Sequence, residues 1–175
     1  MSVPASLANL IGHWVGTNDL WLSPEEPCRK SPTEAVVALA AQGKFVTIQY
    51  TWADDGAPQD GLLMLGYERQ LKTVRAVWID SWHMGDKFML CQGTDGATAS
   101  LPCGAEGRSM GFQPMNCHER GILVKGSYSA PPGPDWGWQI GIEPERDGKF
   151  RIVMHNVSPD GKAALAVEAT YVRKP

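Results

Sequence analysis

One short segment combines aromatic rings with a carboxylate at a spacing that suits ligand binding or acid-base chemistry. In TVRAVWIDSWH, residues 73–83, alternate positions hold Trp78, Asp80 and Trp82. Alternate residues of a β-strand point to the same face of its sheet, so these three side chains would share one environment. A carboxylate buried among indoles needs hydrogen-bond partners or a raised pKa, and such groups concentrate at functional sites. Asp80 is therefore a candidate for ligand contact or acid-base work.

The same segment also fits a purely structural role for Asp80. If Val77 and Ile79 face the core instead, the face of the strand that carries Asp80 is exposed to solvent. Asp80 then caps the end of the strand in water and carries no chemistry. The alternation alone leaves both orientations open.

Further aromatic residues recur at alternating positions elsewhere in the chain. Trp138 lies in the run PPGPDWGWQIGIEPE (131–145), and Tyr50 lies in KFVTIQYTW (44–52). With seven tryptophans in the chain, such faces either fill a core or line an apolar cavity. The predicted ligand-binding residues are Tyr50, Trp78, Asp80, Trp82 and Trp138.

Three kinds of function fit these residues. The favoured hypothesis is a binding protein that holds a small apolar or aromatic molecule against the indoles. An enzyme would use Asp80 as acid or base with a nearby histidine, although the chain has no GxSxG, P-loop or dinucleotide fingerprint. The third is a structural barrel that forms homodimers through a strand edge or through residues 93–120.

The composition of the chain limits the classes of partner that it could bind and the cellular compartment that we expect for it. A net charge of -3 without a run of Lys or Arg argues against nucleic acid. The N-terminus lacks a basic segment followed by an apolar run, and no stretch approaches the roughly 20 apolar residues of a membrane span, so we expect a cytoplasmic protein. Four cysteines without a CxxC pair, Cys28, Cys91, Cys103 and Cys117, favour free thiols and no metal site.

The elements that would position these residues are almost all strands. Alternating runs are separated by turns at 42–44, 54–61, 69–72, 145–149 and 158–162, and Asp-Gly in three of them supplies the positive φ of tight hairpins. We expect one all-β domain over 1–175 with about nine or ten antiparallel strands. A short helix is predicted at SLANLIG (6–12), with Ser6 as N-cap and Gly12 as C-cap. Residues 25–32 and an irregular insertion at 93–120 interrupt the pattern.

Both ends of the chain carry residues that could close such a sheet into a barrel. Gly12-His13-Trp14 opens the first strand, and Tyr171-Val172-Arg173 ends the last. An early Gly-x-Trp with a late Arg resembles the lipocalin (calycin) superfamily, in which the Arg packs across the Trp. The elements LGYE (65–68), WIDS (78–81) and EATYVR (168–173) resemble more closely the uncharacterised bacterial domain-of-unknown-function families with this fold. The resemblance implies a lipocalin-like antiparallel β-barrel closed by Gly12, Trp14 and Arg173, and it implies no established activity.

One histidine, His155, raises the question of haem. Nitrobindin-like barrels bind haem through a histidine close to the start of the last strand, and here that region reads SPDGKAALAV (158–167). His155 lies instead on the preceding strand, where it shares a face with Arg151 and Val153. We therefore expect His155 to be a surface or strand-pairing residue, and we expect neither haem nor another cofactor.

Overall fold

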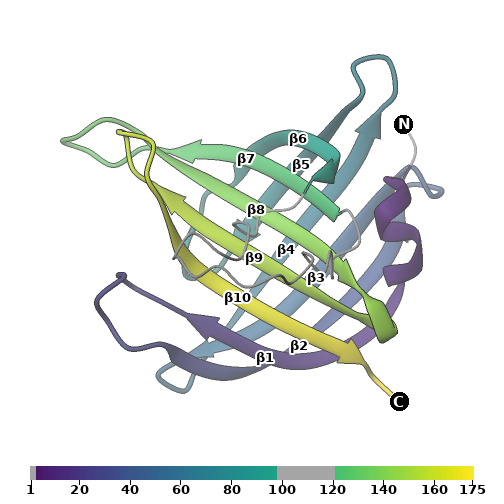
Figure 1. Cartoon of the computed structure of the whole chain (residues 1–175), viewed down its shortest axis with the longest axis horizontal. Coiled ribbons are helices and arrows are strands. Elements are labelled where there is room, and N and C mark those ends of the chain that lie inside the picture. The colour runs from purple at the N-terminus through teal and green to yellow at the C-terminus, as the bar shows by residue number, and fades with distance from the viewer. Residues whose placement is uncertain (1–2, 98–120) are drawn as a thin grey trace, which may run out of the picture.

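The chain folds into one closed β-barrel of antiparallel strands (Figure 1). The computed structural model describes residues 3–97 and 121–175, and ten strands lie within them. Each strand pairs with its neighbours in sequence, and the first pairs with the last. The elements are η1 (Ala5–Leu10), β1 (Gly12–Leu20), β2 (Arg29–Ala40), β3 (Phe45–Asp54), β4 (Ala57–Glu68), β5 (Thr73–Asp80), β6 (Met89–Ala97), β7 (Gly121–Tyr128), β8 (Trp136–Glu145), η2 (Arg146–Gly148), β9 (Lys149–Val157) and β10 (Ala163–Arg173).

The loops alternate between the two ends of the barrel, because successive strands are antiparallel neighbours. The connections after β1, β3, β5, β7 and β9 gather at one end, here called the open end. The 3-10 helix η1 covers the other end, here called the η1 end, and lies against β6, β7 and β8 (Figure 1). Its Leu7 and Leu10 are buried in the hydrophobic core. The η1 end of the barrel is therefore filled by the side chains of η1, whereas the open end is bordered by loops.

Period-2 alternation decides which side chains enter the barrel, as the sequence predicts. On β3, Tyr50 and Trp52 are buried with the other alternate residues of that strand. On β5, Trp78 and Asp80 are buried at 1% and 3% exposure, whereas Ile79 is 41% exposed on the outer face. The orientation that places Ile79 in the core and Asp80 in water is therefore wrong.

The predicted N-terminal helix differs from the observed one in type and in its caps. The structure has a 3-10 helix over Ala5–Leu10 that is preceded by Pro4 and has no side-chain cap. Ser6 lies inside the helix and donates a hydrogen bond to Asp95 Oδ1 at 2.7 Å, and Gly12 is already the first residue of β1. So short a segment is shaped by packing against the barrel more than by its own capping signals. Neither helix of the described chain is long and apolar enough to cross a bilayer.

Strand pairing also extends into segments that the sequence marks as irregular. Residues 29–32 belong to β2, and residues 93–97 belong to β6. In β2 the inward positions Ser31 and Thr33 are buried but polar, so hydropathy does not reveal the alternation. The turn expected at 54–61 is likewise tighter, since only Asp55 and Gly56 separate β3 from β4, both with positive φ. The remainder of the predicted insertion, 98–120, lies outside the described residues.

The barrel closes where β1 meets β10, and the register there sets Trp14 directly opposite Arg173. The Arg173 Cζ atom lies 4.5 Å from the centroid of the Trp14 ring, within the range of a cation-π contact. The guanidinium also donates to the carbonyl oxygens of Ile11 at 3.1 Å and Asn9 at 2.8 Å. Arg173 thus ties the last strand to the segment between η1 and β1.

Gly12 leaves the room that this arrangement needs. A Cβ at position 12 would lie 2.6 Å from Nη1 of Arg173, and the backbone there has a φ of +139°. A side chain at this position would therefore clash with the guanidinium and strain the backbone. The spacing of Gly12 and Trp14 reflects this packing at the η1 end.

We expect Arg173→Ala to lower the free energy of unfolding by about 1–2 kcal/mol, because it removes the cation-π contact and two hydrogen bonds to carbonyls. Chemical denaturation measures the change. Lys174→Ala is the matched control, since the Lys174 side chain makes only an exposed ion pair with Glu34, and such pairs contribute little. Equal effects of the two substitutions would contradict the closure by Arg173.

Candidate functional site

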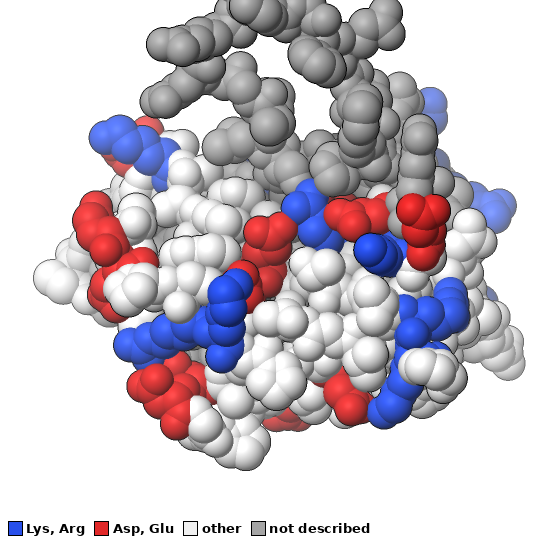
Figure 2. All heavy atoms as spheres, turned by 60° about the horizontal axis from the view of Figure 1, so that its bottom comes forward, with Lys and Arg blue, Asp and Glu red and all other residues white. Residues whose placement is uncertain are grey.

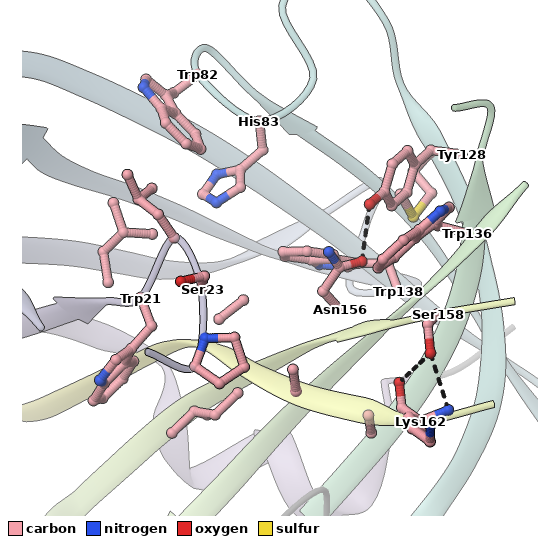
Figure 3. A pocket seen from close by; sticks show the side chains of 18 of the residues that line it. Trp21, Ser23, Trp82, His83, Tyr128, Trp136, Trp138, Asn156, Ser158 and Lys162 are labelled. Atoms are coloured by element: carbon pink, nitrogen blue, oxygen red, sulfur yellow. Dashed lines mark hydrogen bonds between the residues drawn. The ribbon is translucent and has the colours of Figure 1, made fainter. Parts of the chain in front are cut away.

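A cavity of about 720 Å³ occupies the open end of the barrel (Figure 3). Its walls come from three loops, β1–β2, β5–β6 and β9–β10, and from strand ends at the same end of the barrel. The described lining residues are Leu20–Pro24, Trp78, Trp82–Met84, Met89, Tyr128, Trp136, Trp138, Asn156, Ser158 and Lys162–Ala166. The side chains that the close-up labels come from strands and loops on several sides of the same space.

Indole rings make much of the cavity wall. Trp78 and Trp138 stack with their planes 10° apart and their centroids 5.4 Å apart. These rings belong to β5 and β8 and are 1% and 6% exposed, so they form the floor of the cavity. Trp82 and Trp136 lie nearer the solvent, with Trp82 40% exposed. The site thus offers flat apolar surfaces at more than one depth.

Asp80 lies behind this wall and fixes the turn that follows β5. Its Oδ1 accepts hydrogen bonds from the backbone amides of Trp82 at 3.0 Å and His83 at 2.9 Å, and it lies 3.0 Å from His83 Nδ1. Its Oδ2 accepts from Tyr50 Oη at 2.8 Å and from Trp52 Nε1 at 3.3 Å. Five donors therefore converge on one carboxylate that is 3% exposed.

The hydrogen-bond chain continues through Tyr50 to the stacked indoles. Trp78 Nε1 donates to Tyr50 Oη at 2.8 Å, and the hydroxyl directs its own proton toward Asp80. Burial, followed by the charge of Asp80, raises the pKa of Tyr50 well above its usual value, so the phenol stays a donor. Gly61 makes room for it, since a Cβ there would lie 2.3 Å from the Tyr50 hydroxyl.

The pKa of Asp80 is lowered in spite of its burial. Desolvation alone would raise it, but hydrogen bonds from the ring and backbone amide of His83, together with the Tyr50 hydroxyl, outweigh that effect. Asp80 is therefore ionised at neutral pH, and its oxygens can only accept. It follows that Nδ1 of His83 carries the proton of this hydrogen bond.

Three other polar side chains of the cavity wall, Tyr128, Ser158 and Lys162, have partners within the protein. Tyr128 donates to Asn156 Oδ1 at 2.8 Å. Ser158 Oγ accepts from the backbone amide of Lys162, and the Lys162 ammonium, 86% exposed, pairs with Asp160. These contacts shape the rim near the β9–β10 turn.

The residues predicted from sequence divide into two groups in the structure. Trp78, Trp82 and Trp138 line the cavity, whereas Tyr50 and Asp80 are not among the lining residues and support the wall from behind. Sequence reasoning did not single out His83, which does line the cavity with its side chain 12% exposed. The signal that would have found it is the Asp-x-x-His spacing at the end of a strand.

His155 faces away from the cavity. It alternates with the core residues Ile152 and Met154 of β9, yet it is only 6% exposed on the outer side. Desolvation lowers its pKa, and its Nδ1 has no hydrogen-bond partner within the described chain. The absence of haem stays a prediction. Among residues 3–97 and 121–175, no three His, Cys, Asp or Glu side chains gather closely enough to hold a metal ion.

Charge at the surface shows no segregation on the face drawn in Figure 2, where basic and acidic side chains intermingle with uncharged ones.

The third hypothesis requires a strand edge through which two copies could pair. The ten described strands form a continuous ring, because β1 pairs with β10. A free edge is therefore not available for dimerisation in that ring. The homodimer itself stays a prediction.

We expect Asp80→Asn to lower the free energy of unfolding by about 2–4 kcal/mol. Donors surround both oxygens, so the new amide group would face a donor in either orientation. The wild type should also lose stability as pH falls below about 4. A carboxylate whose pKa is lowered by folding stabilises the folded state at pH values above its unfolded pKa, and this stabilisation is lost as the pH falls toward the folded pKa. Denaturation of both proteins across pH measures these effects, with Asp135→Asn, at an exposed position of the β7–β8 loop, as control. An Asp80→Asn variant as stable as wild type would contradict the network.

Comparison with known proteins agrees with this architecture. A crystal structure of Rv2717c from M. tuberculosis is similar to the chain, with a TM-score of 0.62 and 14% identity, over 99% of this chain and 100% of that one. A likeness at that identity concerns the fold alone. No curated protein matches the sequence. The family model described as "Protein of unknown function (DUF1579)" matches residues 3–173, and with nearly its whole length in that match the protein belongs to the DUF1579 family.

Proposed function

We propose that the protein binds a small, largely apolar molecule with an aromatic ring in the cavity at the open end of the barrel. The observation that carries the proposal is the wall of five indoles, from Trp21, Trp78, Trp82, Trp136 and Trp138, around one space of about 720 Å³. Small-molecule sites usually measure about 300–1,000 Å³ and are lined mainly by apolar and aromatic groups. A space of this size accepts a compound of two or three fused or linked rings.

The arrangement of the wall favours a planar ligand. Trp78 and Trp138 are stacked and deeply buried, so their orientation is set before any ligand arrives. A preformed aromatic surface binds without the entropy cost of ordering flexible side chains. Polar lining groups such as His83 and Asn156 are few, which suits a ligand with one or two hydrogen-bonding groups.

An acid-base role for Asp80 itself is not part of this proposal. Asp80 does not line the cavity, and each of its oxygens already accepts more than one hydrogen bond. Such a carboxylate organises the site without reaching a substrate.

The proposal also includes a lipocalin-like barrel, supported by the Trp14–Arg173 contact. It includes a cytoplasmic location as well, supported by the free thiols of Cys28 and Cys91.

Titration with 7-methoxycoumarin, a planar bicyclic probe, tests the proposal. We expect micromolar binding, seen as a change in tryptophan fluorescence and by isothermal titration calorimetry. Trp136→Ala removes a half-buried ring from the wall and should weaken binding about tenfold through lost contact area. Trp138→Ala should weaken it further.

Leu90→Ala is the matched control, because Leu90 is 69% exposed on the outer face of β6 and should leave binding unchanged. Loss of affinity in that variant but not in Trp136→Ala would place the ligand outside the cavity. No binding of this probe or of related bicyclic arenes would contradict the proposal.

A further inference from the structure

We propose that His83 is the specificity-determining residue of the cavity and that it selects aromatic ligands carrying an acidic hydroxyl of phenol or enol type, whose proton it accepts at Nε2. This inference rests on the proposed binding function and adds to it the chemical class of the ligand. The carrying observation is the placement of one imidazole between a buried carboxylate and the open cavity.

The orientation of the His83 ring decides which atom meets the ligand. Nδ1 lies 3.0 Å from Asp80 Oδ1, and the ring extends from the β5–β6 turn into the cavity (Figure 3). The backbone amide of His83 also donates to Oδ1, so the main chain and the ring are held by the same atom. Within the described residues Nε2 has no hydrogen-bond partner. In the neutral imidazole it presents a lone pair, which only a donor can satisfy.

The surroundings of His83 bring an aromatic ring to that lone pair. The imidazole centroid lies 4.7 Å from Trp82, 5.5 Å from Trp138 and 5.7 Å from Trp78. A ligand hydroxyl that reaches Nε2 therefore leaves its own ring next to indole surfaces. A phenol meets both requirements with one rigid group.

The charges near the cavity favour an acidic hydroxyl over a preformed carboxylate. Asp80 is the charged group that touches His83, and it is an anion whose Oδ1 already occupies Nδ1 of the ring at 3.0 Å. The Lys or Arg side chain among the described lining residues is that of Lys162, which is largely exposed and paired with Asp160. A ligand carboxylate would thus lack a buried cation until His83 is protonated, whereas a phenol supplies the proton itself.

The proton step is simple and balanced. The O–H bond of the ligand breaks, the proton bonds to Nε2, and the products are a phenolate and an imidazolium. Nδ1–H stays hydrogen-bonded to Asp80, and the pair of opposite charges lies between indole rings, where attraction exceeds that in water. No other reactant takes part, and the step reverses when the ligand leaves.

The test compares 7-hydroxycoumarin with 7-methoxycoumarin, which differ only in the acidic hydrogen and a methyl group. At about pH 7 we expect the wild type to bind the hydroxy compound at least tenfold more tightly. Its fluorescence excitation spectrum should show a larger phenolate fraction bound than free at the same pH. Coumarin-3-carboxylate should bind more weakly than the hydroxy compound.

Two variants assign these effects to His83. His83→Phe keeps a ring but no acceptor, so it should bind both coumarins with similar affinity and show no gain in phenolate. His83→Gln keeps an acceptor that cannot take a proton, so it should retain part of the preference without the phenolate signal. The phenolate gain surviving in His83→Phe would overturn the assignment.

Equal binding of the two coumarins by the wild type, or tighter binding of the carboxylate, would overturn the inference while leaving the proposed binding function intact. Failure of the wild type to bind either coumarin would contradict both. The two failures are therefore distinguishable in one series of titrations.

Discussion

The organisation of the open end depends on one buried carboxylate. Asp80 is the last residue of β5, and its two oxygens receive donors from β3 and from the turn that leads to β6. An ionised group at 3% exposure is tolerated only when its hydrogen bonds replace those of water. That requirement holds Tyr50 and His83 in place, and Tyr50 in turn holds the Trp78 indole. A polar network thus sets the geometry of a mostly apolar wall.

The two ends of the barrel contrast in how they use aromatic residues. At the η1 end, Trp14 and Phe150 meet edge to face at 4.7 Å, and Phe150 stacks on Tyr171 at 4.6 Å, in the same core cluster as Leu7 of η1. That end is filled. At the open end, Trp78 and Trp138 form a similar stack, but the loops stand apart and leave a cavity above it. The barrel closure and the candidate site can therefore change independently.

Much of the barrel could be predicted from sequence, because strand alternation and hairpin turns are local. Period 2 places Trp78 and Asp80 on one face of their strand but leaves open which face is buried. The closure by Gly12, Trp14 and Arg173 was expected from the resemblance to lipocalin-like barrels. The partners of Asp80 could not be predicted, because Tyr50 lies 30 residues away and the pairing register decides whether they meet. His83 was overlooked for a related reason. It lies beyond the strand, where alternation no longer indicates direction, and only the carboxylate fixes its ring.

Sequence patterns also cannot predict whether the barrel interior is filled or contains a cavity. That depends on the distance between the loops of the open end and the stacked rings of Trp78 and Trp138. The central claim is that an aromatic ligand occupies this space beside His83. Nuclear Overhauser effects between bound 7-hydroxycoumarin and the protein test that claim most directly. We predict cross-peaks from the ligand to the ring protons of Trp138, Trp78 and His83. Cross-peaks to outer-face residues such as Leu90 and Phe88, with none to these three rings, would contradict the account.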